Sequence, residues 1–232
     1  MDPKDKELET IRQKALNRRS RRELPVDTGL STWELVRGLL KAGESDEALL
    51  LLDQGLAEDR AVHDNLVNSV GDYLKYFFSF LPEEKMEALL RERYFPTAKR
   101  NVEVKAAVEK IMQGFVRYQR ANGSQVTIKD EPDRYVVTYD PCGSGGYLIK
   151  NRPDLKLERA YPWSWSKTGV NYYCLHCCIA WEIIPTELRG YPLYIHFPPE
   201  HPDAPCIQYH YKKPELIPEE YFSRIGQVKT IK

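Results

Sequence analysis

The residues best suited to chemistry in this sequence are its five cysteines, all of which lie between Cys142 and Cys206. Four of the five histidines fall in the same part of the chain: His176, His196, His201 and His210. Thiolate and imidazole are ligands that zinc prefers, and thiolate-rich sites also suit iron–sulfur clusters or, less often, copper. Because an odd number of cysteines cannot all pair in disulfides, the cluster predicts metal ligands or reactive thiols, with inert buried cysteines as the alternative.

The first cysteine, Cys142, stands in a glycine-rich segment that runs from Asp140 to Gly146 with the sequence DPCGSGG. Glycines let backbone amides approach a sulfur closely, and such N–H groups stabilise a thiolate. The spacing is not that of a phosphate-binding loop, and no strong helix is predicted after it. The segment therefore predicts a thiolate that acts as a nucleophile or a metal ligand.

Three more cysteines lie in the segment Tyr172–Ile184, which is predicted to be a short helix that ends or kinks at Pro185. In a helix, one face carries Cys174, Cys177 and Cys178, together with Trp181 and Glu182. His176 then points elsewhere. If Cys174 and Cys177 instead form a zinc knuckle, His176 lies between two ligands and Cys178 joins the core.

The last cysteine opens a predicted strand, in which alternation places Cys206, Gln208 and His210 on one face. A single cysteine, a Cys-x2-Cys pair and a further single cysteine form a moderately specific pattern for metal binding. It predicts a zinc site whose leading ligands are Cys142, Cys174, Cys177 and Cys206. Cys178 and His176 are the alternative ligands.

Aromatic side chains gather beside these cysteines, which suggests an apolar pocket with polar tips or, alternatively, rings that simply cover the sheet. The predicted substrate-binding residues are Trp163, Trp165, Tyr173, Trp181 and His210. The predicted catalytic residues are Glu182, as a desolvated general acid or base, and His176. The alternative for Glu182 is a solvated helix carboxylate.

The function expected from these residues is that of a metal-dependent enzyme, a hydrolase or lyase, acting on a small molecule. Three protein ligands would leave a position for a bound water whose pKa lies near 7, whereas four cysteines would make a closed structural site. The alternative is a structural-zinc protein that binds a small molecule, senses or interacts without catalysis. Thiol redox chemistry through Cys174 and Cys177 is a third reading.

Two resemblances accompany these patterns. Pro141–Gly145 (PCGSG) resembles the core of the short zinc-binding SEC-C motif, although the flanking cysteines of that motif are missing or misplaced. Residues 100–212 resemble the L-2-amino-thiazoline-4-carboxylic acid hydrolase-like family in layout: Cys142 after a strand, Cys174 and Cys178 on a later helix, and Cys206 opening a terminal strand. That resemblance implies an α+β domain with a cysteine-lined pocket and hydrolytic opening of a small heterocycle. The glycine-rich loop departs from the expected family pattern.

The composition of the chain excludes some kinds of binding partner. Lys and Arg number 34, equal to Asp and Glu, so the formal net charge is zero and a dedicated nucleic-acid binder is not expected. No apolar run approaches the roughly 20 residues of a membrane span. The polar N-terminus has no hydrophobic signal core, which predicts a cytoplasmic protein with reduced thiols. A small-molecule substrate is the expected partner, and a homo-oligomer through the N-terminal helices is a further expectation.

The elements that must position these residues are predicted to be helices before residue 122 and mainly strands after it. Residues 1–30 are predicted to be an N-terminal arm, and 31–121 a helical region that begins with the capping box Ser31-Thr-Trp-Glu34. Its last helix is predicted to start near Asn101 and to pass through Phe115. Residues 122–213 alternate with period 2 and are predicted to form the metal-binding or catalytic domain, followed by a C-terminal tail, 214–232. The fold class is α+β, with the helical region packed on an antiparallel sheet and a short helix.

Further strands are expected at Gln125–Lys129, Arg134–Asp140, Tyr147–Lys150, Pro192–Phe197 and Cys206–Lys212.

Overall fold

A computed structural model describes residues 31–231, and the predicted arm at 1–30 lies outside these described residues. The chain divides into two compact units that meet between His63 and Asp64, and each is described by itself. Within the described residues, helices and one antiparallel sheet give a mixed α+β fold, as predicted. No helix in this part of the chain is long and apolar enough to cross a membrane.

The first unit contains α2, Thr32–Ala42, and the beginning of α3, Ser45–Phe80. The predicted capping box is confirmed: Ser31 Oγ accepts the backbone N–H of Glu34 at 3.2 Å, and the Glu34 carboxylate accepts that of Ser31 at 2.8 Å. Gly43 ends α2 with a left-handed φ of 81°, which glycine adopts without strain. The two helices bury a small apolar cluster of Val36, Ala48 and Leu51.

The second unit contains the rest of α3 and two further long helices, α4 (Glu83–Glu103) and α5 (Val108–Ala121). The last predicted helix, which starts near Asn101 and passes through Phe115, is confirmed from Val108 onwards, but its predicted start is wrong, because Asn101 still belongs to α4 and the chain breaks between α4 and α5. Lys105 takes a left-handed φ of 46° in this break. The break lets α5 start afresh with its own apolar face, on which Met112 and Val116 are buried.

The C-terminal half of α3 exposes a stripe of large apolar side chains at spacings of three and four residues: Leu66, Val70, Tyr73, Phe77 and Phe80. Such a stripe is the usual face of a helix that packs on another helix. The homo-oligomer expected through the N-terminal helices stays a prediction.

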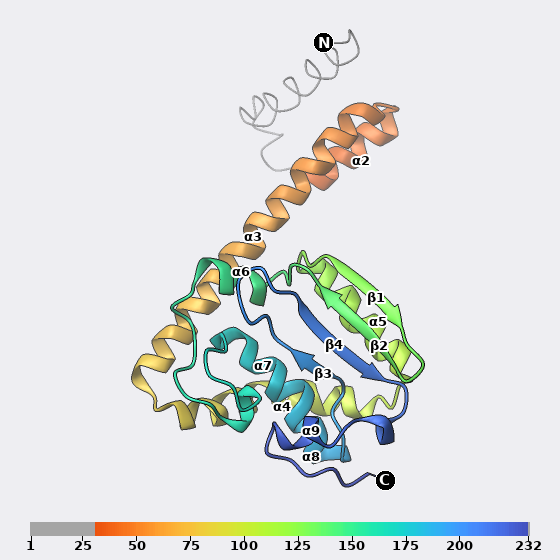
Figure 1. Cartoon of the computed structure of the whole chain (residues 1–232). Coiled ribbons are helices and arrows are strands. Elements are labelled where there is room, and N and C mark those ends of the chain that lie inside the picture. Colours follow the sequence, from red (N-terminus) through yellow and green to blue (C-terminus); the bar gives the residue numbers. More distant parts are fainter. Residues whose placement is uncertain (1–30, 232) are drawn as a thin grey trace. The chain divides into compact units, whose positions relative to one another are not determined.

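Four strands form the sheet, in the order β1-β2-β4-β3 with every pair antiparallel (Figure 1). Their bounds are Val126–Asp130 for β1, Arg134–Tyr139 for β2, Ile195–Phe197 for β3 and Cys206–Tyr211 for β4. The predicted strands at these four places are confirmed, although β3 is shorter than expected. One face of the sheet packs against α5, and this core includes Tyr139 and Cys206.

The predicted strand Tyr147–Lys150 is wrong, because Gly145–Asn151 forms the helix α6, which starts at the end of the glycine-rich loop. The predicted helix over Tyr172–Ile184 exists in pieces. A 3₁₀ turn (Tyr172–Cys174) leads into α7 (Leu175–Cys177), a wide π-helical turn (Cys178–Ile183) and α8 (Ile184–Arg189). π-Helical turns are rare and are often found at functional sites.

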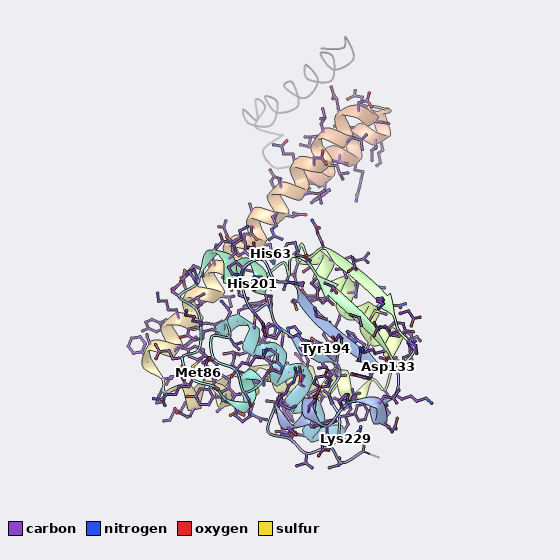
Figure 2. The ribbon with its side chains drawn as sticks, viewed as in Figure 1. His63, Met86, Asp133, Tyr194, His201 and Lys229 are labelled. Carbon is purple, nitrogen blue, oxygen red and sulfur yellow. The ribbon has the colours of Figure 1, made fainter. Side chains whose placement is uncertain are left out.

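Residues that follow β4 also contribute to the hydrophobic core. Helix α9 (Glu220–Ser223) buries Phe222, and Ile225 follows it into the interior. Figure 2 shows Tyr194 in the interior near the sheet, and Lys229 near the C-terminal end of the chain. This C-terminal packing matters for the site because it brings Arg224 against the π-helical turn, where its guanidinium meets Glu182.

Candidate functional site

One pocket of the second unit is lined by four thiols and two imidazoles: Cys142, Cys174, Cys177, Cys206, His176 and His196. These side chains come from the glycine-rich loop, the Tyr172–Cys177 turns and the strands β3 and β4. The cavity measures about 40 Å³. A water molecule needs at least about 10–15 Å³ in this measure, so the cavity holds an ion or very few small molecules of that size.

Cys142 is the sulfur in this pocket that receives the most hydrogen-bond donors. The thiol of Cys206 donates to it, and so do the backbone N–H groups of Ser144, Gly145 and Gly146. These contacts lower the pKa of Cys142 to about 6, with the Cys206 thiol as the largest cause, although burial acts in the opposite direction. Cys142 therefore carries a thiolate at neutral pH.

Two glycines allow the loop to wrap around this sulfur. A Cβ on Gly145 would lie 2.9 Å from Cys174 Sγ and 3.7 Å from Cys142 Sγ, so any side chain there would push into the pocket. A Cβ on Gly143 would lie 1.9 Å from the carbonyl oxygen of Asn122, a contact that backbone atoms cannot make. The N–H of Gly143 donates to Ser124 Oγ at 2.8 Å, which anchors the loop to the end of α5.

A chain of hydrogen bonds runs across the sheet to the Cys206 thiol. Gln208 Oε1 accepts the hydroxyl of Tyr139 at 3.0 Å and Nε2–H of His210 at 3.2 Å. The amide nitrogen of Gln208 lies 3.4 Å from His196 Nδ1, and His196 Nε2 lies 3.5 Å from Cys206 Sγ. The register explains the chain, because Gln208 pairs with His196 in β3, and Cys206 pairs with Tyr139 in β2.

The direction of these hydrogen bonds follows from the Gln208 amide. Its oxygen accepts twice, so its nitrogen donates to His196 Nδ1, and the proton of that imidazole sits on Nε2. Burial lowers the pKa of His196 to about 3, which keeps the ring neutral. His196 Nε2–H then donates to Cys206 Sγ, and the Cys206 thiol donates onward to Cys142. The donors around Cys142 favour a negative charge on that sulfur, and Cys206 keeps its proton because its hydrogen bond to Cys142 and its burial raise its pKa.

The second imidazole of the pocket is paired with another thiol. His176 Nδ1–H donates to the carbonyl of Tyr173, so Nε2 is an acceptor that faces Cys177 Sγ at 3.5 Å. The ring stacks on Tyr94, with ring centres 5.2 Å apart. Burial lowers the pKa of His176 and raises those of Cys174 and Cys177, so these three groups are neutral at pH 7.

Cys178 lies outside the pocket. Its thiol donates to the carbonyl of Pro162 at 3.6 Å, and burial raises its pKa. His201, which belongs to the histidine cluster of the sequence, is exposed and is not among the residues that line the pocket.

Of the predicted substrate-binding residues, Tyr173 lines the pocket, and its hydroxyl receives a hydrogen bond from Ser144. His210 does not line the pocket, and its Nε2–H donates to Gln208, which in turn contacts His196. The three tryptophans lie in the surrounding core: Trp163 and Trp165 are buried, and Trp181 is partly buried edge-on to Phe115.

Glu182 is fully buried behind the pocket and is surrounded by donors. Its carboxylate accepts Arg224 Nη2 at 2.9 Å on both oxygens, Trp165 Nε1–H at 2.7 Å and the backbone N–H of His196 at 2.7 Å. Burial raises the pKa of Glu182, and the Arg224 guanidinium acts in the opposite direction. Trp165 also stacks on the His196 ring, with centres 5.4 Å apart and planes 11° apart. Glu182 thus holds both the backbone and the ring of His196.

His196, Gln208 and Tyr139 are not among the site residues predicted from the sequence. The alternation of β4 did place Gln208 beside Cys206, and all three predicted face residues of β4 are buried. His196 lies in the predicted strand Pro192–Phe197, but its contact partner Cys206 is ten residues further along the chain, so only the strand register reveals the contact.

Across residues 31–231, no group of three or more His, Cys, Asp or Glu side chains is arranged so as to hold a metal ion. All five cysteines are buried and free of disulfides. Comparison of the chain with family models, with curated proteins and with solved structures finds no match.

Proposed function

We propose that this protein is a thiol-dependent enzyme in which the Cys142 thiolate attacks an electrophilic centre of a small molecule. The observation that carries the proposal is the donor set on one sulfur at the wall of a pocket: the Cys206 thiol and three backbone N–H groups. A thiolate is the nucleophilic form of cysteine, and a site that holds it ionised at neutral pH is suited to covalent catalysis.

Hydrolysis is the reaction class that suits the remaining groups. The Cys142 sulfur would form a bond to the electrophilic carbon while a leaving group departs, and water would then cleave the adduct. His176 is the candidate base for that water, because its neutral ring exposes an acceptor at Nε2 and is held by Tyr173 and Tyr94. Glu182 is a positioning residue in this proposal, since it contacts His196 rather than the pocket.

Selective alkylation tests the proposal. Reduced protein is treated with substoichiometric iodoacetamide at pH 7, and the modified peptide is identified by mass spectrometry. We expect the label on Cys142, its loss in Cys142→Ser, and normal labelling in Cys178→Ser, the matched control outside the pocket. Labelling that spreads evenly over the five cysteines, or that prefers Cys177, would overturn the proposal.

A second candidate function is the binding of a soft metal ion, zinc first, by Cys142, Cys174, Cys177 and Cys206. It is favoured by one observation: these four thiols line the same small cavity. Their side chains would have to rotate, because they are not arranged as a metal site among the described residues. Zinc analysis of protein purified from zinc-supplemented cells tests it: one zinc per chain that disappears in Cys142→Ser and Cys206→Ser supports metal binding.

The two candidates make opposite predictions for the thiols. A zinc-bound Cys142 would resist alkylation until a chelator is added, whereas a free nucleophile reacts at once and is unaffected by the chelator. Either role requires reduced cysteines, so we place the protein in a reducing compartment such as the cytoplasm.

A further inference from the structure

The contact between Cys206 and Cys142 gives the pocket a second use that goes beyond attack on carbon. Both sulfurs line the same small cavity and belong to the same buried cluster, and a hydrogen bond from the Cys206 thiol is the largest cause of the lowered pKa of Cys142. Cys142 follows β2 by three residues, and Cys206 begins β4 opposite Tyr139, the last residue of β2. Both positions are therefore fixed by one pair of strands.

We propose that Cys142 and Cys206 form a peroxide-reducing dithiol, which converts a small hydroperoxide to water or an alcohol and itself becomes a disulfide. The proposal rests on the nucleophilic role of Cys142. The size of the cavity favours this substrate class, because a volume of about 40 Å³ admits a molecule of two oxygen atoms more readily than a carbon ring.

The chemistry balances in two steps. The Cys142 thiolate attacks one peroxide oxygen; the S–O bond forms, the O–O bond breaks, and the departing oxygen takes a proton from solvent to leave as water or an alcohol. The resulting sulfenic acid is then attacked by the Cys206 sulfur. The S–S bond forms, the S–O bond breaks, and hydroxide leaves with the Cys206 proton as water. Two electrons pass from the dithiol to the peroxide.

The surroundings of Cys206 fit the second step. Its sulfur lies 3.5 Å from His196 Nε2, so the imidazole helps to hold this sulfur in place beside Cys142. Cys206 shares a buried cluster with Cys142, whereas Cys174 belongs to another cluster, and the Cys206 thiol is the thiol that donates to the Cys142 sulfur. Cys206 is therefore the resolving thiol.

The test uses reduced, chelator-treated full-length protein and one equivalent of hydrogen peroxide at pH 7. We expect two of the five thiols to be lost per chain and peptide mapping to find a Cys142–Cys206 disulfide. A dithiol reductant should restore both. In Cys206→Ser the reaction should stop at a sulfenic acid on Cys142, which dimedone traps, whereas Cys142→Ser should lose no thiol.

Cys178→Ser serves as the control and should behave as the unmodified chain does, with circular dichroism confirming that each variant folds. A disulfide between Cys174 and Cys177, or no thiol loss after an hour with one equivalent of peroxide, would overturn the proposal. Iodoacetamide labelling of the same sample separates the two ideas. If Cys142 alkylates rapidly yet forms no disulfide, the redox inference fails alone; if Cys142 does neither, the nucleophilic role fails as well.

Discussion

A carboxylate oxygen of Glu182 accepts the backbone N–H of His196 at 2.7 Å, and this bond ties the π-helical turn to strand β3. The same oxygen accepts Trp165 Nε1–H, and Arg224 donates to both carboxylate oxygens. Arg224 Nη2 also donates to the carbonyl of His196 at 3.0 Å, so both backbone groups of His196 are held by one ion pair. The imidazole that faces Cys206 is positioned from behind by these buried charges.

Replacing Glu182 by Gln should therefore destabilise the protein strongly. All groups that touch the carboxylate are donors, so an amide NH₂ in its place meets other donors and leaves the Arg224 charge uncompensated. Removing one partner of a buried ion pair costs about 3–5 kcal/mol, and Glu182 is 0% and Arg224 16% exposed. Urea unfolding followed by tryptophan fluorescence measures the loss.

Glu187→Gln is the matched control for that experiment. Glu187 pairs with Arg91 at 2.9 Å, but both side chains are about one third exposed. An exposed ion pair contributes at most about 1 kcal/mol, so this variant should unfold near the urea concentration of the parent. Equal losses in Glu182→Gln and Glu187→Gln would contradict the structural role assigned to the buried pair.

Much of this fold follows from local sequence patterns. The Ser31–Glu34 capping box, the alternation of β1, β2 and β4 and the shared face of Cys206, Gln208 and His210 all depend on neighbours within a few residues. The α+β class follows from the change of period between the helices and the strands. These local patterns predict the observed elements correctly because the intrinsic preference of the residues and the burial of their apolar side chains favour the same helix or strand.

The rest of the fold and the site depends on contacts between residues that are far apart in the sequence. Tyr147, Leu148 and Ile149 look like a strand, yet they form α6, which starts within the glycine-rich loop at Gly145. His196 meets Cys206 only through the register of β3 on β4. Trp165 donates to Glu182, and Trp163 and Trp181 pack in the surrounding core, contacts that depend on residues far away in the sequence. The four thiols of the predicted site do share one cavity, and that part of the pattern was informative.

The alkylation rate of Cys142 should depend on pH in a way that differs from an ordinary thiol. Its pKa is lowered from 9.0 to about 6, so the thiolate predominates above pH 6 and is lost as the pH falls through that value. Peptide-resolved alkylation between pH 4.5 and 9 should therefore show a midpoint near 6 and a plateau above 7. A rate that still rises steeply between pH 8 and 9 would show that the sulfur is not held as a thiolate.

Two substitutions of Cys206 separate its donor role from its place in the core. The Cys206 thiol is the largest cause of the lowered pKa of Cys142, so Cys206→Ala should move the alkylation midpoint of Cys142 upward from about 6. Cys206→Ser keeps a hydroxyl donor of similar size and should leave the midpoint lower than the alanine variant does. Identical midpoints in both variants would show that Cys206 only fills space.

Gly145→Ala should damage the pocket, because the added Cβ would lie 2.9 Å from Cys174 Sγ and the buried loop has little freedom to yield. Overpacking of this kind costs about 1–3 kcal/mol, and the displaced amides should slow the alkylation of Cys142 by about tenfold. Gly114→Ala is the control, since a Cβ there meets nothing within 4 Å and lies within α5. That variant should gain about 0.5–1 kcal/mol from the better helix former while Cys142 reacts as before. If Gly145→Ala leaves both the unfolding midpoint and the alkylation rate unchanged, the loop does not hold the sulfur as tightly as its amide contacts imply.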